Sequence, residues 1–242
     1  IEPKGNEPQQ KLRCPKCKSI GKENWKDTCL SINLVEGIYN CHKCGFYGTV
    51  KNTIKETIRM NKTYVEPTRK GIKKLSAKGK KFLNDRGITD EVIERNKIAS
   101  STDDKFIVFP YIKGGELVNY KKRGVDGKFF IQAKDAKPII YNYDGVKGQK
   151  SIVICEGEFD SLSWEVAGVS FHTSVNMGAP NKGDKSIDKK LECLTTCYDV
   201  FDEASKIYIA TDNDDNGRVL EQELIRRFGA DKCKLVDLRP FK

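Results

Sequence analysis

One stretch of ten residues, 151–160, constrains the fold of this chain more than any other. It reads Ser-Ile-Val-Ile-Cys-Glu-Gly-Glu-Phe-Asp, so a short apolar run leads directly into three carboxylates. A short β-branched run predicts a buried strand of a parallel sheet, and the residues that follow predict the start of a helix. The acids Glu156, Glu158 and Asp160 are therefore expected at the carboxyl end of a strand, where open α/β sheets place their sites.

A second stretch repeats this pattern. Residues 206–211 are again mostly apolar, and they lead into Asp-Asn-Asp-Asp-Asn-Gly at 212–217. Two parallel strands that each end in acids bring those acids to one edge of a sheet, and Mg²⁺ takes one or two carboxylates plus substrate phosphates. The pattern therefore favours a magnesium site. The same six residues also resemble the first half of a calcium-binding EF-hand loop, but that loop needs a helix before it and here a strand is expected.

The amino-terminal part of the chain contains two Cys-x-x-Cys pairs. Their four residues are Cys14, Cys17, Cys41 and Cys44. This spacing lets two thiolates on one turn bind a single Zn²⁺, so residues 1–50 are predicted to form a β zinc ribbon with one structural zinc ion. Cys29 falls outside the pattern, and we expect it to be an ordinary residue. Residues 1–11 are polar, and we expect them to be disordered.

The middle of the chain is rich in cations. Residues 51–74 predict a basic linker, and residues 75–145 predict a small α+β subdomain with a helical hairpin followed by a β-hairpin. Three of its basic side chains follow one another along the β region, where alternate residues share a face: Lys121, Arg123 and Lys128. The formal net charge of the 242 residues is +10, which favours a polyanionic partner, nucleic acid first.

Residues 146–242 predict an α/β domain, because strand and helix patterns alternate along them. The expected strands lie near residues 151–155, 169–174, 206–211 and 233–237. The expected helices lie near residues 158–167, 187–204 and 216–228. No apolar run approaches the roughly 20 residues that a membrane span needs, so no membrane partner is expected. No signal peptide is visible, and paired metal-spaced cysteines indicate a reducing compartment.

These motifs together resemble a known family. Glu156 followed by the Asp-x-Asp pair of Asp212 and Asp214 resembles a TOPRIM domain, and the run through Gly217 and Arg218 is similar to the form seen in primases. The Arg-Gly-Ile at residues 86–88, the helical hairpin and the basic β region resemble the DnaG-type and phage primases. The order of zinc ribbon, linker, basic subdomain and TOPRIM domain is similar to the primase half of phage primase–helicases, to which Twinkle is related.

The resemblance implies a DNA primase, which is a template-directed RNA polymerase that uses NTPs to make short RNA primers on single-stranded DNA. It implies Mg²⁺ or Mn²⁺ as the catalytic ion, with Glu156, Asp212 and Asp214 as the catalytic and metal-binding acids. Lesser metal candidates are Glu158, Asp160 and Asp215. The positions that would contact nucleotide and nucleic acid are Arg86, Lys121, Arg123 and Lys128.

The resemblance also implies partners and a location. A replicative helicase, fused or associated, and a DNA polymerase are expected beside the template and the primer. The cytoplasm is the expected compartment (that of the bacterial host if a phage encodes the chain), and secretion is not expected. The family often has a further acid after the last strand, and residues 239–242 end at about that point, so we expect the natural protein to continue.

Two alternative functions keep the TOPRIM fold. A TOPRIM nuclease uses similar acids, and the assay that separates it from a primase asks whether DNA is cut or NTPs are joined. A non-catalytic zinc and TOPRIM DNA-binding protein of the recombination-mediator type would have an eroded acid set. The presence of Glu156, Asp212 and Asp214 argues against the second alternative, and the zinc ribbon with the basic middle favours polymerisation over cleavage.

Overall fold

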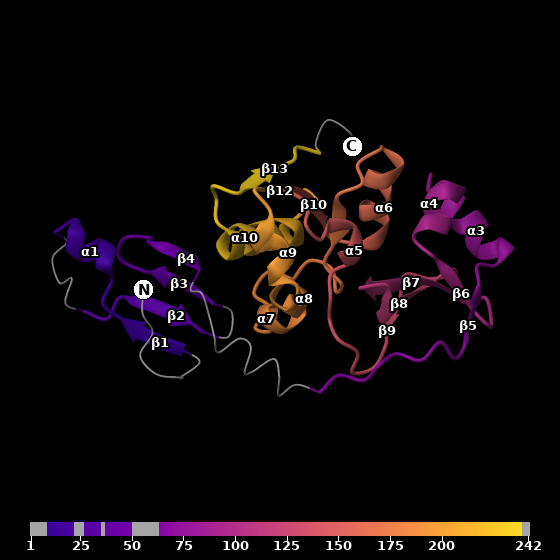
Figure 1. The fold of residues 1–242 in the computed structure, drawn as a ribbon, viewed down its shortest axis with the longest axis horizontal. Coiled ribbons are helices and arrows are strands. Elements are labelled where there is room, and N and C mark those ends of the chain that lie inside the picture. The colour runs from indigo at the N-terminus through magenta and orange to yellow at the C-terminus, as the bar shows by residue number, and fades with distance from the viewer. Residues whose placement is uncertain (1–8, 22–26, 35–36, 50–62, 239–242) are drawn as a thin grey trace. The chain divides into compact units, whose positions relative to one another are not determined.

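The structure is a computed structural model that describes residues 9–21, 27–34, 37–49 and 63–238 of the chain. It divides the chain into two compact units. The first comprises residues 1–63 and 222–231, and the second comprises residues 64–221 and 232–242. Figure 1 shows the elements of both.

The amino-terminal unit contains a small antiparallel sheet with the strand order β1-β2-β3-β4. The strands are β1 (Gln9–Leu12), β2 (Leu30–Asn33), β3 (Ile38–Cys41) and β4 (Tyr47–Thr49), and a short helix, α1 (Pro15–Ser19), follows β1. Leu30 and Ile32 are buried while Ser31 between them is exposed, which is the alternation of a half-buried strand. The expectation of disorder over residues 1–11 is wrong for the part that the structure describes, because β1 pairs with β2 along its whole length.

The second unit begins with a five-stranded antiparallel sheet and two helices. Its elements are β5 (Ile72–Lys74), α3 (Ala77–Asn84), α4 (Asp90–Arg95), β6 (Ala99–Ser101), β7 (Phe106–Lys113), β8 (Glu116–Gly124) and β9 (Phe130–Gln132). The predicted helical hairpin is present. Ser76 caps α3 by accepting a hydrogen bond from the backbone of Gly79, and Gly87 after it has a φ of 78° that favours glycine. The predicted β-hairpin is β7 and β8.

The predicted linker covers residues 51–74, of which 50–62 lie outside the described residues. Its last three residues, Ile72–Lys74, form β5 and pair with β6. The basic subdomain therefore begins earlier than the sequence indicated, because a three-residue edge strand rich in lysine gives no clear signal in the sequence.

The rest of the second unit contains a parallel sheet with the order β11-β10-β12-β13. Its strands are β10 (Ser151–Cys155), β11 (His172–Ser174), β12 (Lys206–Ala210) and β13 (Cys233–Leu235). The helices are α5 (Tyr143–Val146), α6 (Glu158–Val166), α7 (Ile187–Lys190), α8 (Glu192–Thr196), α9 (Tyr198–Glu203) and α10 (Asp215–Phe228), and residues 222–228 of α10 belong to the first unit. Strands alternate with helices and β10 is buried from Ile152 onward, as a parallel strand covered on both faces should be.

The helix predicted over residues 187–204 is wrong as a single element, since the chain forms the three short helices α7, α8 and α9 there. The breaks fall at Leu191 and Cys197, which are fully buried and depart from helical backbone angles. The two adjacent threonines before Cys197 have weak helix propensity. Burial of the Leu191 and Cys197 side chains therefore decides the path of the backbone.

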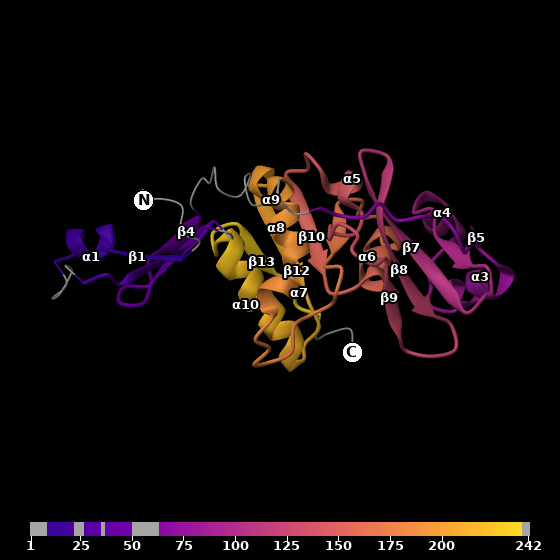
Figure 2. The same ribbon diagram turned by 90° about the horizontal axis from the view of Figure 1, so that it is seen from below.

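Helix α6 connects the two sheets of the second unit. Both views place α6 between the parallel sheet and the strands β7 and β8 (Figures 1 and 2). Phe159 near its start packs edge-on against Phe109 of β7, with ring centroids 5.3 Å apart, and against Phe82 of α3 at 6.1 Å. The first turn of α6, which follows the acidic stretch, is therefore fixed by apolar contacts on the side of the basic subdomain.

None of the described helices is long and apolar enough to cross a membrane.

Candidate active site and metal centre

Glu156 and Asp212 meet at the carboxyl edge of the parallel sheet. Glu156 directly follows β10, and Asp212 lies two residues beyond the end of β12, which pairs with β10 in register from Ser151 to Cys155. The backbone N–H of Asp212 donates a hydrogen bond of 2.8 Å to Oε1 of Glu156. The strand ends thus bring the two acids together as the sequence predicted, and the bond fixes the direction of the Glu156 side chain.

Gly217 leaves room for this arrangement. A Cβ atom at this position would lie 2.0 Å from the carbonyl oxygen of Asp212 and 2.7 Å from Oε1 of Glu156. Two atoms cannot approach each other this closely. Any side chain at position 217 would therefore force the Asp212 loop to move. The N–H of Gly217 also donates to Oδ1 of Asp214 at 2.8 Å, so Asp214 caps the first turn of α10.

The acids share a crowded electrostatic environment. Burial of its carboxyl group, together with repulsion from Asp212 and Asp214, raises the pKa of Glu156 to about 7, against the opposing effect of the hydrogen bond from Asp212. The pKa of Asp160 is raised to about 6 by desolvation of its carboxyl group and by Asp212, although the residue as a whole is exposed. A cation held between these groups would relieve the repulsion.

Glu158 differs from the other acids because both of its oxygens have partners. Lys121 donates to Oε2 at 3.0 Å, Tyr111 donates to Oε1, and the Glu158 side chain is only 2% exposed. Lys121 comes from β8 and Tyr111 from β7, on the same face of the five-stranded sheet. Glu158 therefore binds the basic subdomain to the start of α6. Its role as a metal ligand stays a prediction, and these contacts argue against it.

A cleft of about 620 Å³ brings acids and cations together. Its acidic wall contains Glu156 and Asp160, and its basic wall contains Lys121 and Lys128, all within the second unit. The remaining lining residues are Phe130, Gln132, Gly157, Glu158, Phe159, Asn176, Met177 and Gly178. A cleft with an acidic wall for a divalent ion and a basic wall for phosphates suits a nucleotide.

Arg86 and Arg123 gather around Phe82, next to this cleft. The guanidinium of Arg86 lies 4.0 Å from the ring centroid of Phe82 and that of Arg123 lies 5.9 Å from it. Arg123 is buried and donates to the carbonyl oxygens of Gly124, at 2.6 Å, and Gly127, so it holds the turn between β8 and β9. Arg86 is exposed and offers its charge to a ligand.

Mg²⁺ at this site stays a prediction, and the donor set fits it. Carboxylate oxygens from two adjacent loops suit a hard cation that takes only one or two carboxylates from the protein. Asp212, Asp214 and Asp215 are exposed, and Asp215 lies 3.6 Å from the guanidinium of Arg218. The side-chain nitrogen of Asn213 in the same loop is buried without a partner among the described residues, but as a hydrogen-bond donor it is not a ligand for a cation.

The four predicted zinc ligands form one cluster. The ligand atoms of Cys14, Cys17, Cys41 and Cys44 all lie within 4.8 Å of one another. Zn–S bonds of about 2.3 Å place the sulfur atoms of a tetrahedral site just under 4 Å apart, so the cluster fits one Zn²⁺. Burial alone would raise the pKa of the Cys41 thiol, but backbone N–H groups at Cys44 and Lys43 outweigh it and lower the pKa to about 6.

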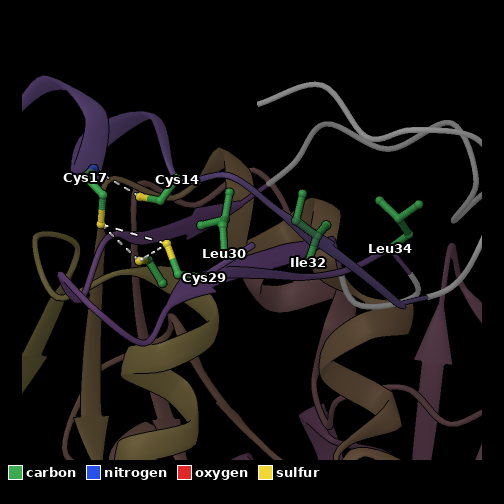
Figure 3. Packing of buried hydrophobic residues seen from close by; sticks show 7 residues of the cluster. Cys14, Cys17, Cys29, Leu30, Ile32 and Leu34 are labelled. Carbon is green, nitrogen blue, oxygen red and sulfur yellow. Dashed lines mark hydrogen bonds between the residues drawn. The ribbon is translucent and has the colours of Figure 1, made fainter. Parts of the chain in front are cut away.

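Cys29, which the sequence pattern set aside, is a fifth sulfur beside this cluster. Its Sγ lies 3.6 Å from Sγ of Cys41 and 4.0 Å from Sγ of Cys17 (Figure 3). It directly precedes β2, whose Leu30 and Ile32 form the small core next to the cluster. Spacing rules look for pairs on one turn, so a single cysteine twelve residues from either pair gave no signal.

Three further residues of the site were missed by sequence reasoning. Tyr111 gave a weak signal, since it faces the same side of the hairpin as Lys121. Gly217 follows the acidic run and was not singled out as a close-contact glycine. Asn176 belongs to no motif of the sequence, and only the structure shows that it lines the cleft.

Comparison with known proteins finds a family model and relatives that this chain resembles. Residues 151–238 match the model of the Toprim domain family. The chain is 32% identical over 240 residues to a primase homolog protein of Arabidopsis thaliana, covering 93% of this chain and 71% of that protein. It is 32% identical over 238 residues to the chloroplastic/mitochondrial Twinkle homolog of the same plant, but there it spans only 33% of the relative.

Solved structures show the same fold. The primase fragment of the bacteriophage T7 primase-helicase protein superposes with a TM-score of 0.56 at 23% identity, covering 94% of this chain and 89% of that chain. A DnaG catalytic core gives a TM-score of 0.51 at 12% identity, covering 67% of this chain and 65% of that chain. The expected fold class, an α/β Toprim domain with a small α+β subdomain and a zinc ribbon, is confirmed.

Proposed function

The chain belongs to the family of Toprim-containing DNA primases, to judge by the primase homolog that it matches over most of both lengths, and from this premise we propose that it makes short RNA primers on single-stranded DNA. The observation that carries the proposal is that Glu156, which accepts a hydrogen bond from the backbone of Asp212, lines a cleft together with Lys121 and Lys128. The reaction joins the 3′-hydroxyl of the primer to the α-phosphorus of an NTP and releases diphosphate.

Each acid has a proposed role. Asp212, Asp214 and Glu156 would hold Mg²⁺ or Mn²⁺, which supplies charge stabilisation for the attacking and leaving oxygens. The alternative role of Glu156 is to accept the proton of the 3′-hydroxyl, for which the carboxyl group is suited near neutral pH when it holds no cation, since its pKa is then about 7. Asp160 and Asp215 are secondary metal candidates.

The cations have matching roles. Lys121, held by Glu158 at the cleft, and the exposed Lys128 would contact the phosphates of the NTP. Arg86 would contact template or nucleotide, and Arg123 supports the turn that carries Lys128. The zinc ribbon would contribute to template choice and hold the primer.

The partners are also proposals. We infer that the chain works with a replicative helicase, because the phage T7 fragment with the same fold is the primase part of a primase-helicase protein. A DNA polymerase would then extend the primer. The compartment stays a prediction: the sequence indicates the cytoplasm, whereas the Twinkle homolog carries a chloroplastic/mitochondrial designation.

The decisive experiment supplies radiolabelled NTPs, Mg²⁺ and single-stranded templates to the chain and resolves the products on a gel. We expect short RNA products from the wild-type chain and none from Glu156→Gln or Asp212→Asn. Glu203→Gln is the matched control, since Glu203 is exposed at the end of α9, away from the cleft. Cleavage of the DNA without use of NTPs would establish the nuclease alternative instead.

A further inference from the structure

Asn176 is a lining residue of the cleft, and its side chain contains a buried hydrogen-bond acceptor. The residue follows β11, is only 2% exposed and lines the cleft, yet its Oδ1 atom has no partner among the described residues. Gln132 of β9 fixes the orientation of the amide. Nδ2 of Asn176 donates to Oε1 of Gln132 at 3.2 Å, and Nε2 of Gln132 donates to the carbonyl oxygen of Asn176 at 2.7 Å.

Nδ2 already donates one hydrogen to Gln132, whereas Oδ1 has no partner among the described residues and can only accept. Buried acceptors without partners are rare in folded proteins, since leaving one unpaired opposes folding. The partner of Oδ1 is therefore expected to be a ligand group that carries an N–H or O–H donor. Neither the acids nor the lysines of the cleft use this atom.

Apolar side chains lie next to this acceptor. Phe130 and Met177 line the same cleft and are 48% and 52% exposed, which is unusual for side chains of this size. The ring of Phe130 is held by two cations, with Nζ of Lys121 at 4.9 Å and the guanidinium of Arg123 at 5.0 Å from its centroid. The rest of the ring surface remains available for packing.

We propose that Phe130, Met177 and Asn176 form a nucleoside-binding subsite, in which a nucleoside packs on the two apolar side chains and donates a hydrogen bond to Oδ1 of Asn176. The subsite rests on the proposed function, because it takes the nucleoside of a nucleotide whose phosphates meet Lys121 and Lys128. An aromatic platform accepts the π-face of any base, whereas the buried acceptor selects for a donor.

Two groups of a nucleotide could supply that donor. A ribose hydroxyl would make Asn176 a determinant of RNA over DNA precursors, and an exocyclic amino group would make it a determinant of base identity. A site built to pair with a donor rejects an analogue that lacks it, because its own polar atom is then left unpaired. The two sources can therefore be separated with two analogues.

Equilibrium binding tests the subsite without turnover. The chain is titrated by calorimetry with α,β-methylene-ATP in the presence of Mg²⁺. The titration is repeated with the 2′-deoxy analogue and with the analogue in which unsubstituted purine replaces adenine, so that the exocyclic amino group is absent. We expect the wild-type chain to bind one of the two analogues about three- to tenfold more weakly than the parent nucleotide. Asn176→Ala should weaken the parent to the same level and remove the discrimination.

Matched variants control for indirect effects. Asn181→Ala changes an exposed asparagine of the same loop that does not line the cleft, and it should bind like the wild-type chain. Phe130→Leu should weaken all three ligands, whereas Phe129→Leu, with the same 48% exposure but outside the cleft, should not. Thermal melting of each variant checks that it folds.

The outcomes separate this proposal from the proposed function. If the chain joins NTPs but Asn176→Ala binds and discriminates as the wild-type chain does, the subsite is wrong and the primase assignment stands. If nucleotide binding depends on Asn176 and Phe130 as described but no NTP is joined on any template, the subsite is supported and the primase assignment is wrong.

Discussion

The position of Glu156 depends on the backbone of the neighbouring loop more than on its own side-chain preferences. The N–H of Asp212 holds one carboxylate oxygen, and Gly217 permits the close approach. A carboxylate held by a single backbone bond, with acids on either side, has a raised pKa because its charged form is poorly solvated. The residue is thus poised for proton transfer near neutral pH.

Replacing Gly217 by alanine should disable the site while leaving the fold intact. The added methyl group would meet the carbonyl of Asp212 at 2.0 Å, so the acidic loop must move. We expect loss of stability on the order of 1–3 kcal/mol in urea unfolding, as for other overpacked sites, and at least a hundredfold lower primer synthesis, as misplaced catalytic groups usually cause. Asn216→Ala, one residue earlier, is the control; comparable activity in both variants would contradict the role of Gly217.

Binding of Mg²⁺ should depend on pH through Glu156. With a pKa of about 7 in the absence of metal, the carboxyl group is mostly protonated at pH 6 and mostly ionised at pH 8. A cation binds the ionised form, so affinity should rise about tenfold between these values, and binding at pH 7 should release about half a proton per ion, because half of the carboxyl groups are already ionised. Isothermal titration in two buffers of different ionisation enthalpy measures the release. Glu156→Gln should show both effects much reduced, since Asp160, with a pKa of about 6, is then the acid that still titrates near this range, and a pH-independent affinity of the wild-type chain would refute the assignment.

The pair of Lys121 and Glu158 should matter for stability mainly because removing one partner leaves the charge of the other buried and unpaired. Both side chains are less than 10% exposed and lie 3.0 Å apart. Lys121→Met should cost about 3 kcal/mol in urea unfolding by leaving the carboxylate unpaired, and adding Glu158→Gln should restore most of it. The exposed pair of Lys147 and Asp199 is the control, where Lys147→Met should cost under about 1 kcal/mol.

At the level of elements, the sequence predicts those helices, strands and sites that one hydrophobic period or one motif spacing determines. The runs at β10 and β12 are short and β-branched, so both strands and the meeting of their acids follow from the residues. The region of α7, α8 and α9 was not predictable, because buried Leu191 and Cys197 interrupt an otherwise helical pattern for reasons of packing. The orientation of the Asn176 amide, which leaves Oδ1 without a partner among the described residues, depends on Gln132 of a distant strand. No local pattern in the sequence encodes such a contact.

Sequence spacing is limited in the same way in the zinc ribbon, where Cys29 can be tested against Cys41, one of the four predicted zinc ligands. Cys29→Ser should retain one zinc per chain, because four other cysteines already form the cluster, whereas Cys41→Ser should lose at least tenfold in affinity. Zinc content after dialysis against a chelator, and the charge-transfer bands of the cobalt-substituted chain, measure both. A weaker cobalt spectrum in Cys29→Ser than in Cys41→Ser would show that Cys29 is the ligand.

For the whole molecule, the net charge of +10 is meaningful only in relation to where unpaired cations lie. Several lysines of the basic subdomain are neutralised locally, as in the pair of Lys73 with Asp104 and that of Lys80 with Asp90. Lys128, by contrast, is exposed in the cleft and has no ion-pair partner among the described residues. Binding of nucleic acid should therefore depend on a few such positions and not on the total charge.

Salt dependence distinguishes these possibilities. Each phosphate contact with single-stranded DNA contributes about −0.7 to the slope of log K against log salt concentration, because it releases condensed counterions. Lys128→Ala should make that slope shallower by about 0.7 in a fluorescence anisotropy titration from low to high salt. Lys206→Ala removes the same charge from the opposite end of β12, where the strand begins, and should leave the slope unchanged. Equal changes in both variants would mean that the DNA responds to net charge alone, and the cleft would then have no special place in binding the template.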